Sequence, residues 1–248
     1  MGFTPYPDVD DLLRTLWSGI EAALGPHVVG MYVHGSLALG AFDPLRSDID
    51  FLAVTRGELP PDRVAALATM HAALTGSANH EGSYIPLHAL RRYDPSDCVH
   101  PALRSDGSFG LDRHGSEWVI QRHLVREHGI VLAGPDPRAL IDPIEPDDLR
   151  RAEVGLLREW WAPQVDQPFR LQSSEYKAYA ILTMCRALYM FHSGAVVSKP
   201  VAARWAQARL GEPWASLVES ALAWRRGTEL HCLDEALNFI RYTLDRCL

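Results

Sequence analysis

The stretch HVVGMYVHGSLALGAFDPLRSDIDFLAVT (27–55) decides the fold of the first half of the chain. It begins with a run of β-formers closed by a glycine and ends with a second run, DIDFLAVT. Alternation along this second run directs Ile49 and Phe51 toward a core and Asp48 and Asp50 toward the other face. The stretch therefore predicts two strands joined by a short Gly-Ser turn segment, with two carboxylates on one face.

Helices and strands alternate on both sides of this stretch. We expect an amphipathic helix over 8–24, a helix from Pro60 to about Leu74 that Gly76 stops, a strand within GSYIPLHAL (82–90), a helix over 116–127 and a short strand over 130–132. Turn formers dominate residues 93–113, and we expect a long irregular excursion there.

A proline-rich segment, GPDPRALIDPIEPDD (134–148), precedes a second half in which strand patterns almost vanish. Helical periodicity there predicts about five helices, including 147–161, 174–192, 199–209, 213–225 and 231–246. We therefore expect an α+β protein: a domain of residues 1–145 with a mixed β-sheet flanked by helices, and an α-helical bundle domain of residues 146–248.

The composition of the chain indicates the kind of molecule it binds and the compartment in which it works. The formal net charge of −7 disfavours a nucleic-acid backbone and favours a cationic small substrate. No apolar run approaches the roughly 20 residues of a membrane helix, and MGFTPYPDVDD lacks the features of a signal peptide, so we expect a cytoplasmic protein. We also expect the protein to be a monomer. The four cysteines are widely spaced and are expected to be free thiols.

Asp48 and Asp50 are candidate magnesium ligands. Magnesium prefers hard oxygen ligands and commonly uses one or two carboxylates together with substrate phosphates. Gly35 and Ser36 directly follow the first strand, where backbone N–H groups and a hydroxyl can face a phosphate. Taken singly, the two motifs also fit a pair of exposed acids and a structural turn.

The order of strand, Gly-Ser, eleven residues and Asp-x-Asp on a strand resembles the signature of the DNA polymerase β-like nucleotidyltransferases. Within that superfamily the chain looks like the aminoglycoside nucleotidyltransferases, specifically those that adenylylate streptomycin and spectinomycin. The second half supports this, because LTMCRALYMFHSGAVVSKPVAARWAQARL (182–210) is similar to the helical domain of those enzymes.

The resemblance implies a third carboxylate on a neighbouring strand, and Glu81 is the acid in the matching place; Asp94 and Asp97 lie in turn-like sequence. Glu81 would be the general base toward the attacking hydroxyl, although a third metal ligand is the alternative. The resemblance further implies ATP as co-substrate and two magnesium ions. The positions that match the family's nucleotide contacts are Arg186, Lys199 and Tyr242. Gly35, Ser36 and Ser47, around the Gly-Ser turn, are further candidates for binding the triphosphate.

The acceptor site implied by the resemblance is an interdomain cleft. Its candidate residues, besides Glu81, are Trp160, Trp161, Asp166 and Glu175. The family's streptomycin-binding tryptophan matches Trp161 better than Trp160, and no acid aligns cleanly after it. Acids and aromatic rings suit an aminoglycoside, which carries ammonium or guanidinium groups. Core packing within a bundle helix is the alternative role of the two tryptophans.

The expected activity is magnesium-dependent transfer of AMP from ATP to a hydroxyl of streptomycin or spectinomycin, with release of pyrophosphate and antibiotic resistance as the result. Transfer of AMP to a partner protein, as in toxin–antitoxin pairs, is a second hypothesis. A catalytically inactive nucleotide- or drug-binding module is a third.

Overall fold

The computed structural model describes residues 2–74 and 80–248, and this part of the chain forms two compact units. Unit 1 contains the chain up to His114 together with Gln121–Pro143, and unit 2 contains Gly115–Ile120 and Ile144–Leu248. The division falls inside helix α5 (Glu117–His128). The predicted helix stop at Gly76 lies outside the described residues.

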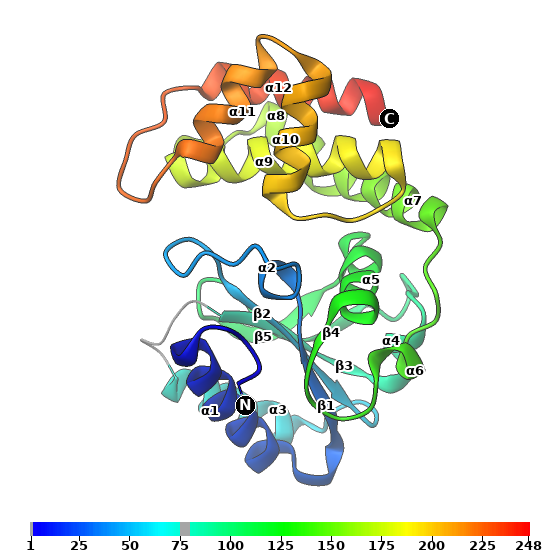
Figure 1. The fold of residues 1–248 in the computed structure, drawn as a ribbon. Coiled ribbons are helices and arrows are strands. Elements are labelled where there is room, and N and C mark those ends of the chain that lie inside the picture. The colour runs from blue at the N-terminus through cyan, green and yellow to red at the C-terminus, as the bar shows by residue number, and fades with distance from the viewer. Residues whose placement is uncertain (1, 75–79) are drawn as a thin grey trace. The chain divides into compact units, whose positions relative to one another are not determined.

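Unit 1 is built around a six-stranded mixed sheet (Figure 1). Its strands are β1 (Val28–Val33), β2 (Ile49–Thr55), β3 (His80–Pro86), β4 (Val99–Leu103), β5 (Phe109–Arg113) and β6 (Ile130–Ala133), in the order β5-β4-β3-β2-β1-β6. Only the neighbours β2 and β3 run parallel, whereas the other neighbouring pairs are antiparallel. The helices of this unit, besides α5, are α1 (Pro7–Leu24), the 3-10 turn η1 (Gly25–His27), α2 (Gly35–Ala38), α3 (Pro61–Ala73), α4 (Leu87–Arg91) and α6 (Pro137–Leu140).

The expected irregular excursion over 93–113 is wrong, because β4 and β5 form an antiparallel hairpin there. The turn formers lie mainly before β4 and at the hairpin tip, where Gly107 has a φ of 81° and the Asp106 carboxylate accepts a hydrogen bond from the Ser108 N–H. Leu103 and Phe109 pair across the hairpin and join the core. The turn residues therefore mark the hairpin connection rather than an unstructured segment.

The core of unit 1 lies on one face of the sheet. Ile49, Phe51 and Ala53 of β2 pack there with the apolar residues of α1 and α3. The intervening residues of β2 point to the opposite face, as alternation predicts.

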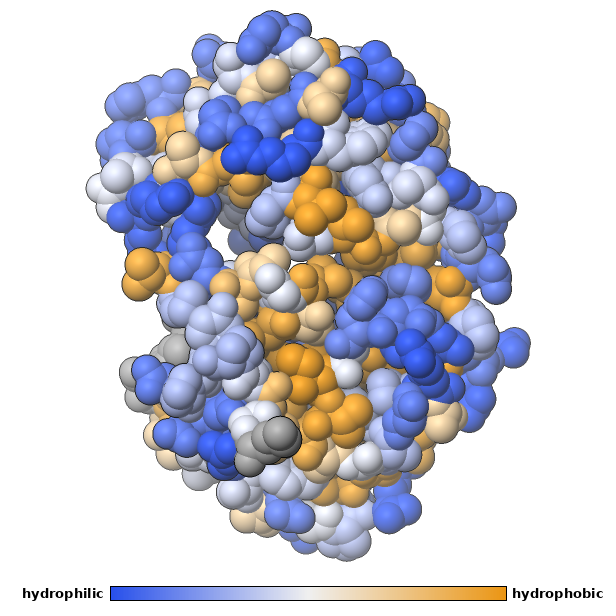
Figure 2. Space-filling model, viewed as in Figure 1, coloured by the Kyte–Doolittle hydropathy of each residue, from blue (hydrophilic) through white to orange (hydrophobic). Residues whose placement is uncertain are grey.

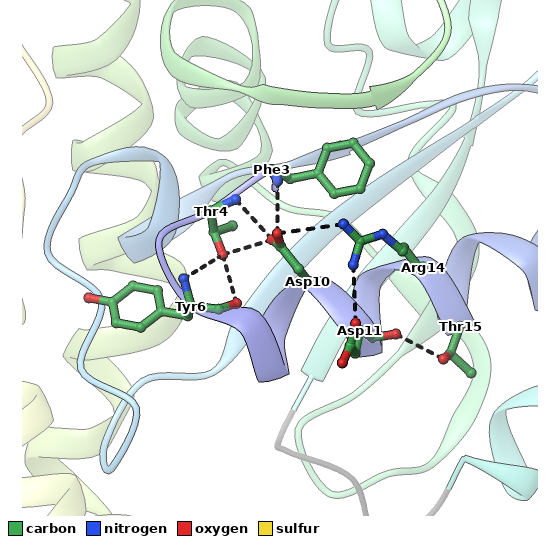
Figure 3. Close-up of polar contacts among 7 residues, drawn as sticks. All are labelled: Phe3, Thr4, Tyr6, Asp10, Asp11, Arg14 and Thr15. Atoms are coloured by element: carbon green, nitrogen blue, oxygen red, sulfur yellow. Dashed lines mark hydrogen bonds and ion pairs between the residues drawn. The ribbon is translucent and has the colours of Figure 1, made fainter. Parts of the chain in front are cut away.

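The start of α1 is fixed by a buried carboxylate (Figure 3). Asp10 accepts hydrogen bonds from the backbone N–H groups of Phe3 and Thr4 and from the Thr4 hydroxyl. Tyr6 donates a hydrogen bond to the Phe42 carbonyl, so the N-terminal segment also holds the connection between β1 and β2.

Unit 2 is helical (Figure 1). Its elements are α7 (Pro146–Leu156), the π-helical turn η2 (Leu157–Trp161), α8 (Ala162–Asp166), the 3-10 turn η3 (Arg170–Gln172), α9 (Ser174–Ser193), α10 (Lys199–Leu210), α11 (Trp214–Ala223) and α12 (Leu233–Cys247). Apolar side chains of α9, α10, α11 and α12 form its core. The α+β fold class, with a mixed sheet in the first half and a helical bundle in the second, is confirmed.

Hydrophilic residues cover much of the face shown in Figure 2, with apolar residues between them. No helix in residues 2–74 and 80–248 is both long and apolar enough to span a membrane. All four cysteines are free and buried.

Candidate active site

Three acids lie at one end of two parallel strands. Asp50 of β2 pairs in register with Glu81 of β3, and Asp48 directly precedes β2. Neighbouring strands are about 4.8 Å apart, and paired residues point to the same face. The buried residues Ile49 and Phe51 point to the other face, so the acids lie on the face that α1 and α3 leave uncovered.

Gly35 lies directly against the Asp50 side chain. A Cβ added at Gly35 would meet Asp50 Oδ2 at 1.8 Å and Asp50 Cγ at 2.7 Å, and the φ of Gly35 is 62°. Both the close approach and the left-handed backbone require glycine. The segment that begins here is one helical turn, α2, rather than the predicted simple turn, because the Leu39 N–H donates to the Gly35 carbonyl and Leu37 is buried.

Ser36 and Ser47 differ in their surroundings. The Ser36 hydroxyl is buried and has no hydrogen-bond partner in the described part of the chain. The Ser47 hydroxyl accepts a hydrogen bond from the Asp43 N–H at 3.1 Å and supports the connection between α2 and β2. A hydroxyl without a partner in the residue after Gly35, which itself lies against the Asp50 carboxylate, fits a bound magnesium–phosphate group, for which Asp48 and Asp50 would be the protein ligands.

His34 is a site neighbour that the sequence analysis missed. Its N–H donates to the Asp50 carbonyl at 3.0 Å, and its side chain is buried. Burial lowers the pKa of His34 below its usual value, and the charge of Asp50 opposes this effect without cancelling it. His34 is therefore neutral at pH 7, so it leaves the negative charge of Asp50 available to a cation.

Two of the predicted nucleotide-binding residues, Arg186 and Lys199, lie on the side of α9 that carries Tyr179. Tyr179, Thr183 and Arg186 follow the i, i+4, i+7 spacing of one helix face. The Lys199 ammonium lies 4.3 Å from the centre of the Tyr179 ring. Thr183 Oγ1 and Arg186 Nε are buried, and neither has a hydrogen-bond partner among the described residues. This face thus presents N–H and O–H groups that could donate hydrogen bonds to a phosphate.

A buried acid lies near Arg186. Glu153 of α7 is 3% exposed, and its Oε1 has no hydrogen-bond partner in the described part of the chain. Burial raises the pKa of Glu153 to about 7, although the charge of Arg186 acts in the opposite direction. At neutral pH, Glu153 therefore compensates the charge of Arg186 only in part. Neither Glu153 nor Thr183 belongs to a motif that the sequence alone would single out.

The two tryptophans of η2 have different environments. Trp161 is 1% exposed and its ring packs near Tyr176 and Tyr179, as a core residue does. Trp160 is 41% exposed, donates a hydrogen bond from Nε1 to the Tyr176 hydroxyl and lies under the Arg170 guanidinium. Trp160 is therefore the more accessible of the two rings.

The remaining predicted acceptor residues are on the surface of unit 2. Asp166 is exposed at the end of α8, and Glu175 is exposed in the first turn of α9. Glu175 forms an ion pair with Arg226 at 3.0 Å. This pair would have to open, or to include a ligand, if Glu175 contacts a substrate.

Tyr242 lies apart from Lys199 within unit 2. Its ring packs on Trp214 and under the Arg246 guanidinium, and it lines a pocket formed in part by the last turn of α10. Lys199 is the first residue of that 12-residue helix, which is about 18 Å long. The structure thus places Lys199 and Tyr242 at opposite ends of α10.

Comparisons with known proteins match the sheet-containing first half and the helical second half of the chain separately. A family model described as "Nucleotidyltransferase domain" matches residues 13–84, and one described as "Aminoglycoside adenylyltransferase, C-terminal domain" matches residues 139–247. Aminoglycoside (3'') (9) adenylyltransferase of Escherichia coli is 27% identical over 259 residues, which cover 95% of this chain and 93% of that protein. Spectinomycin 9-adenylyltransferase of Staphylococcus aureus is 24% identical over 230 residues, which cover 87% and 84%.

The fold also matches a solved structure. A crystal structure of spectinomycin adenyltransferase from Enterococcus faecialis with ATP and spectinomycin superposes with a TM-score of 0.74 at 17% identity, over 96% of this chain and 98% of that chain. At this identity the match shows a shared fold. The two family models and the relatives show that both halves of the chain are similar to aminoglycoside adenylyltransferases, and they support an adenylyltransferase enzyme.

Proposed function

We propose that the enzyme transfers AMP from ATP to a hydroxyl of spectinomycin or streptomycin and releases pyrophosphate. The names of the relatives support an aminoglycoside-type acceptor. The observation that carries the proposal is the in-register pairing of Asp50 with Glu81, with Gly35 packed against the Asp50 carboxylate. This arrangement offers a metal ligand and a general base on adjacent strands.

Asp48 and Asp50 would hold magnesium, with two ions expected, and the bound metal would offset the negative charge of the phosphate oxygens. Gly35 allows the backbone to approach the phosphates, and the Ser36 hydroxyl, which has no hydrogen-bond partner among the described residues, donates a hydrogen bond to them. Ser47 contributes from the loop before β2. These residues orient the triphosphate before the reaction.

Glu81 accepts the proton of the attacking hydroxyl. The oxygen of that hydroxyl forms a bond to the α-phosphorus, the bond from the α-phosphorus to the bridging oxygen breaks, and pyrophosphate leaves with that oxygen. A carboxylate on the strand next to Asp50 is suited to this task, because the acceptor must lie beside the metal-bound phosphate. The alternative role of Glu81, a third metal ligand, predicts weaker magnesium binding in a Glu81→Gln variant.

Arg186 and Lys199 of unit 2 bind the phosphates of ATP. Within residues 2–74 and 80–248, the Arg186 Nε and the neighbouring Thr183 hydroxyl have no hydrogen-bond partner. Both support this role, because a phosphate would satisfy both groups. Tyr242 is a further candidate contact for the nucleotide.

The acceptor is bound by acids and aromatic rings. Trp160 is accessible to a cationic ligand, and Trp161 supports the rings of Tyr176 and Tyr179 from the core. Asp166 and Glu175 supply negative charge for ammonium or guanidinium groups.

The proposal is tested by incubating the enzyme with ATP, magnesium and a panel of spectinomycin, streptomycin and other aminoglycosides, and by measuring pyrophosphate release and product mass. We expect release with spectinomycin, streptomycin or both, and a loss of at least about 100-fold in kcat for Asp50→Asn and Glu81→Gln. Release that requires a partner protein instead would favour the protein-modifying hypothesis. Turnover near the wild-type rate in Glu81→Gln would overturn both roles of Glu81.

A further inference from the structure

A second group of metal-ligating side chains lies at the other end of the parallel strands β2 and β3. Glu58 follows the end of β2, and His88 belongs to α4, which directly follows β3. Because β4 is antiparallel to β3, it begins at this same end, and it brings Asp97 and His100 there. We call Glu58, His88, Asp97 and His100 the distal cluster. It is separate from Asp48, Asp50 and Glu81, which lie where β2 and β3 start.

The spacing of the distal cluster suits a coordinated ion. One carboxylate oxygen each of Glu58 and Asp97 and one ring nitrogen of His100 all lie within 4.8 Å of one another. His88 Nε2 lies 3.1 Å from Asp97 Oδ2 and 3.4 Å from Glu58 Oε1. Tetrahedral zinc with ligands at about 2.0–2.1 Å sets neighbouring ligand atoms about 3.3–3.4 Å apart. Small side-chain movements would therefore bring these donors to a common ion.

His100 is the buried member of the distal cluster, and one of its ring nitrogens lies within 4.8 Å of the Glu58 and Asp97 carboxylate oxygens. Its side chain is 1% exposed, and its Nδ1 is buried without a hydrogen-bond partner in the described part of the chain. Its Nε2 lies 3.3 Å from the Asp97 carbonyl oxygen, which can only accept a hydrogen bond. In the neutral ring, Nε2 then carries the proton and Nδ1 keeps a lone pair. Metal-bound histidines commonly have this arrangement, with the second ring nitrogen bonded to a backbone carbonyl.

We propose that the distal cluster binds a divalent transition-metal ion, with Zn²⁺ as the best fit, through Glu58, Asp97 and His100, with His88 as the fourth ligand. Imidazole nitrogens favour zinc over magnesium or calcium, which select oxygen ligands. The two carboxylates also balance the charge of a divalent ion. Such an ion would tie the segment after β2 to α4 and to the start of β4.

The proposal is tested by zinc binding in an Asp50→Asn background, which weakens the candidate catalytic metal site. The protein is loaded with Zn²⁺ and desalted, and the zinc bound per chain is measured by mass spectrometry of the metal. A chelator competition then gives the affinity. The variants are Glu58→Gln and Asp97→Asn, whose side chains are 62% and 41% exposed and so tolerate replacement without loss of core packing.

The matched control is Asp94→Asn, because Asp94 is an exposed acid of the same loop whose carboxylate is bonded to Ser96. We expect one zinc ion per chain, an affinity at least about 10-fold lower in each ligand variant, and no change in the control. Bound Co²⁺ should give the intense visible absorption of four-coordination. Failure to retain zinc, or equal retention by Glu58→Gln, Asp97→Asn and the control, would overturn the proposal. The role of His88 would then be limited to its ion pairs with Glu58 and Asp97.

Discussion

Replacement of Gly35 by alanine tests how closely the site depends on the contact between this residue and Asp50. The new Cβ would lie 1.8 Å from Asp50 Oδ2, whereas real Cβ contacts are essentially never shorter than 3.0 Å. The two atoms must therefore move apart by at least 1.2 Å. Misplacement of a reacting group by about 1 Å can cost about 100-fold in rate, so we expect Gly35→Ala to lose at least that factor in kcat/KM.

Gly40 offers a matched control for the backbone effect. Its φ is 64°, close to the 62° of Gly35, but a Cβ added there meets nothing within 4 Å. Each alanine should cost about 1–2 kcal/mol in folding free energy, because both positions are left-handed. Only Gly35→Ala should also displace the Asp50 carboxylate.

The assay combines urea unfolding with pyrophosphate release in the presence of ATP, magnesium and the acceptor. We expect Gly40→Ala to be destabilised but active and Gly35→Ala to be destabilised and nearly inactive. If kcat/KM of Gly35→Ala were within about threefold of that of Gly40→Ala, a 1 Å displacement of Asp50 would not matter, and the assignment of Asp50 to the reaction centre would be refuted.

Three further predictions follow from other contacts. Arg186→Ala should weaken ATP binding, measured by calorimetry, by about 10-fold, because it removes a charged hydrogen bond. The control Arg204→Ala removes an exposed arginine that is paired with Glu219, and it should leave ATP binding unchanged. Equal effects of the two substitutions would argue against a phosphate contact of Arg186. Burial lowers the pKa of His71 from 6.5 to about 4, so its contribution to stability is present above pH 6.5 and is lost as the pH falls to 4. His71→Phe combined with Tyr84→Phe, its hydrogen-bond partner, should therefore remove a loss of about 3 kcal/mol in the free energy of unfolding between pH 6.5 and pH 4, as measured by urea unfolding. The same dependence of the unfolding free energy on pH in the variant and the wild type would contradict this. Burial raises the pKa of Glu153 from 4.5 to about 7, so stability is lost as the pH rises from 4.5 to 7. Glu153→Gln should therefore gain up to about 3 kcal/mol in the free energy of unfolding at pH 8 relative to its effect at pH 5. The same effect of the substitution at both pH values would exclude a protonated Glu153.

Local patterns in the sequence were sufficient for the elements that carry the acids. The alternation of Ile49 and Phe51 with Asp48 and Asp50 predicted which side chains enter the core, and the burial of both apolar residues agrees with it. The Gly-Ser motif located the segment against Asp50, although it did not reveal that the segment is a helical turn. These features depend on contacts within about 20 residues, which is why the sequence predicts them.

Features that depend on pairing between distant segments were not predictable in the same way. The hairpin of β4 and β5 has a weak alternation, and its strands gain their stability from the neighbouring β3 rather than from their own composition. The register of Asp50 with Glu81 is a tertiary contact across 31 residues, and only the family resemblance pointed to it. The approach of Glu153 to Arg186, and of Glu58 to His100, likewise has no local signature.

The most direct test of the proposed reaction follows the two ends of the ATP triphosphate. ATP labelled at the α-phosphate or at the γ-phosphate is incubated with magnesium, spectinomycin or streptomycin, and either the wild-type enzyme or Glu81→Gln. Transfer of AMP predicts that the α-label appears in the antibiotic and the γ-label in pyrophosphate, and that Glu81→Gln greatly slows both. Appearance of the γ-label in the antibiotic, or of neither label in it, would contradict the account.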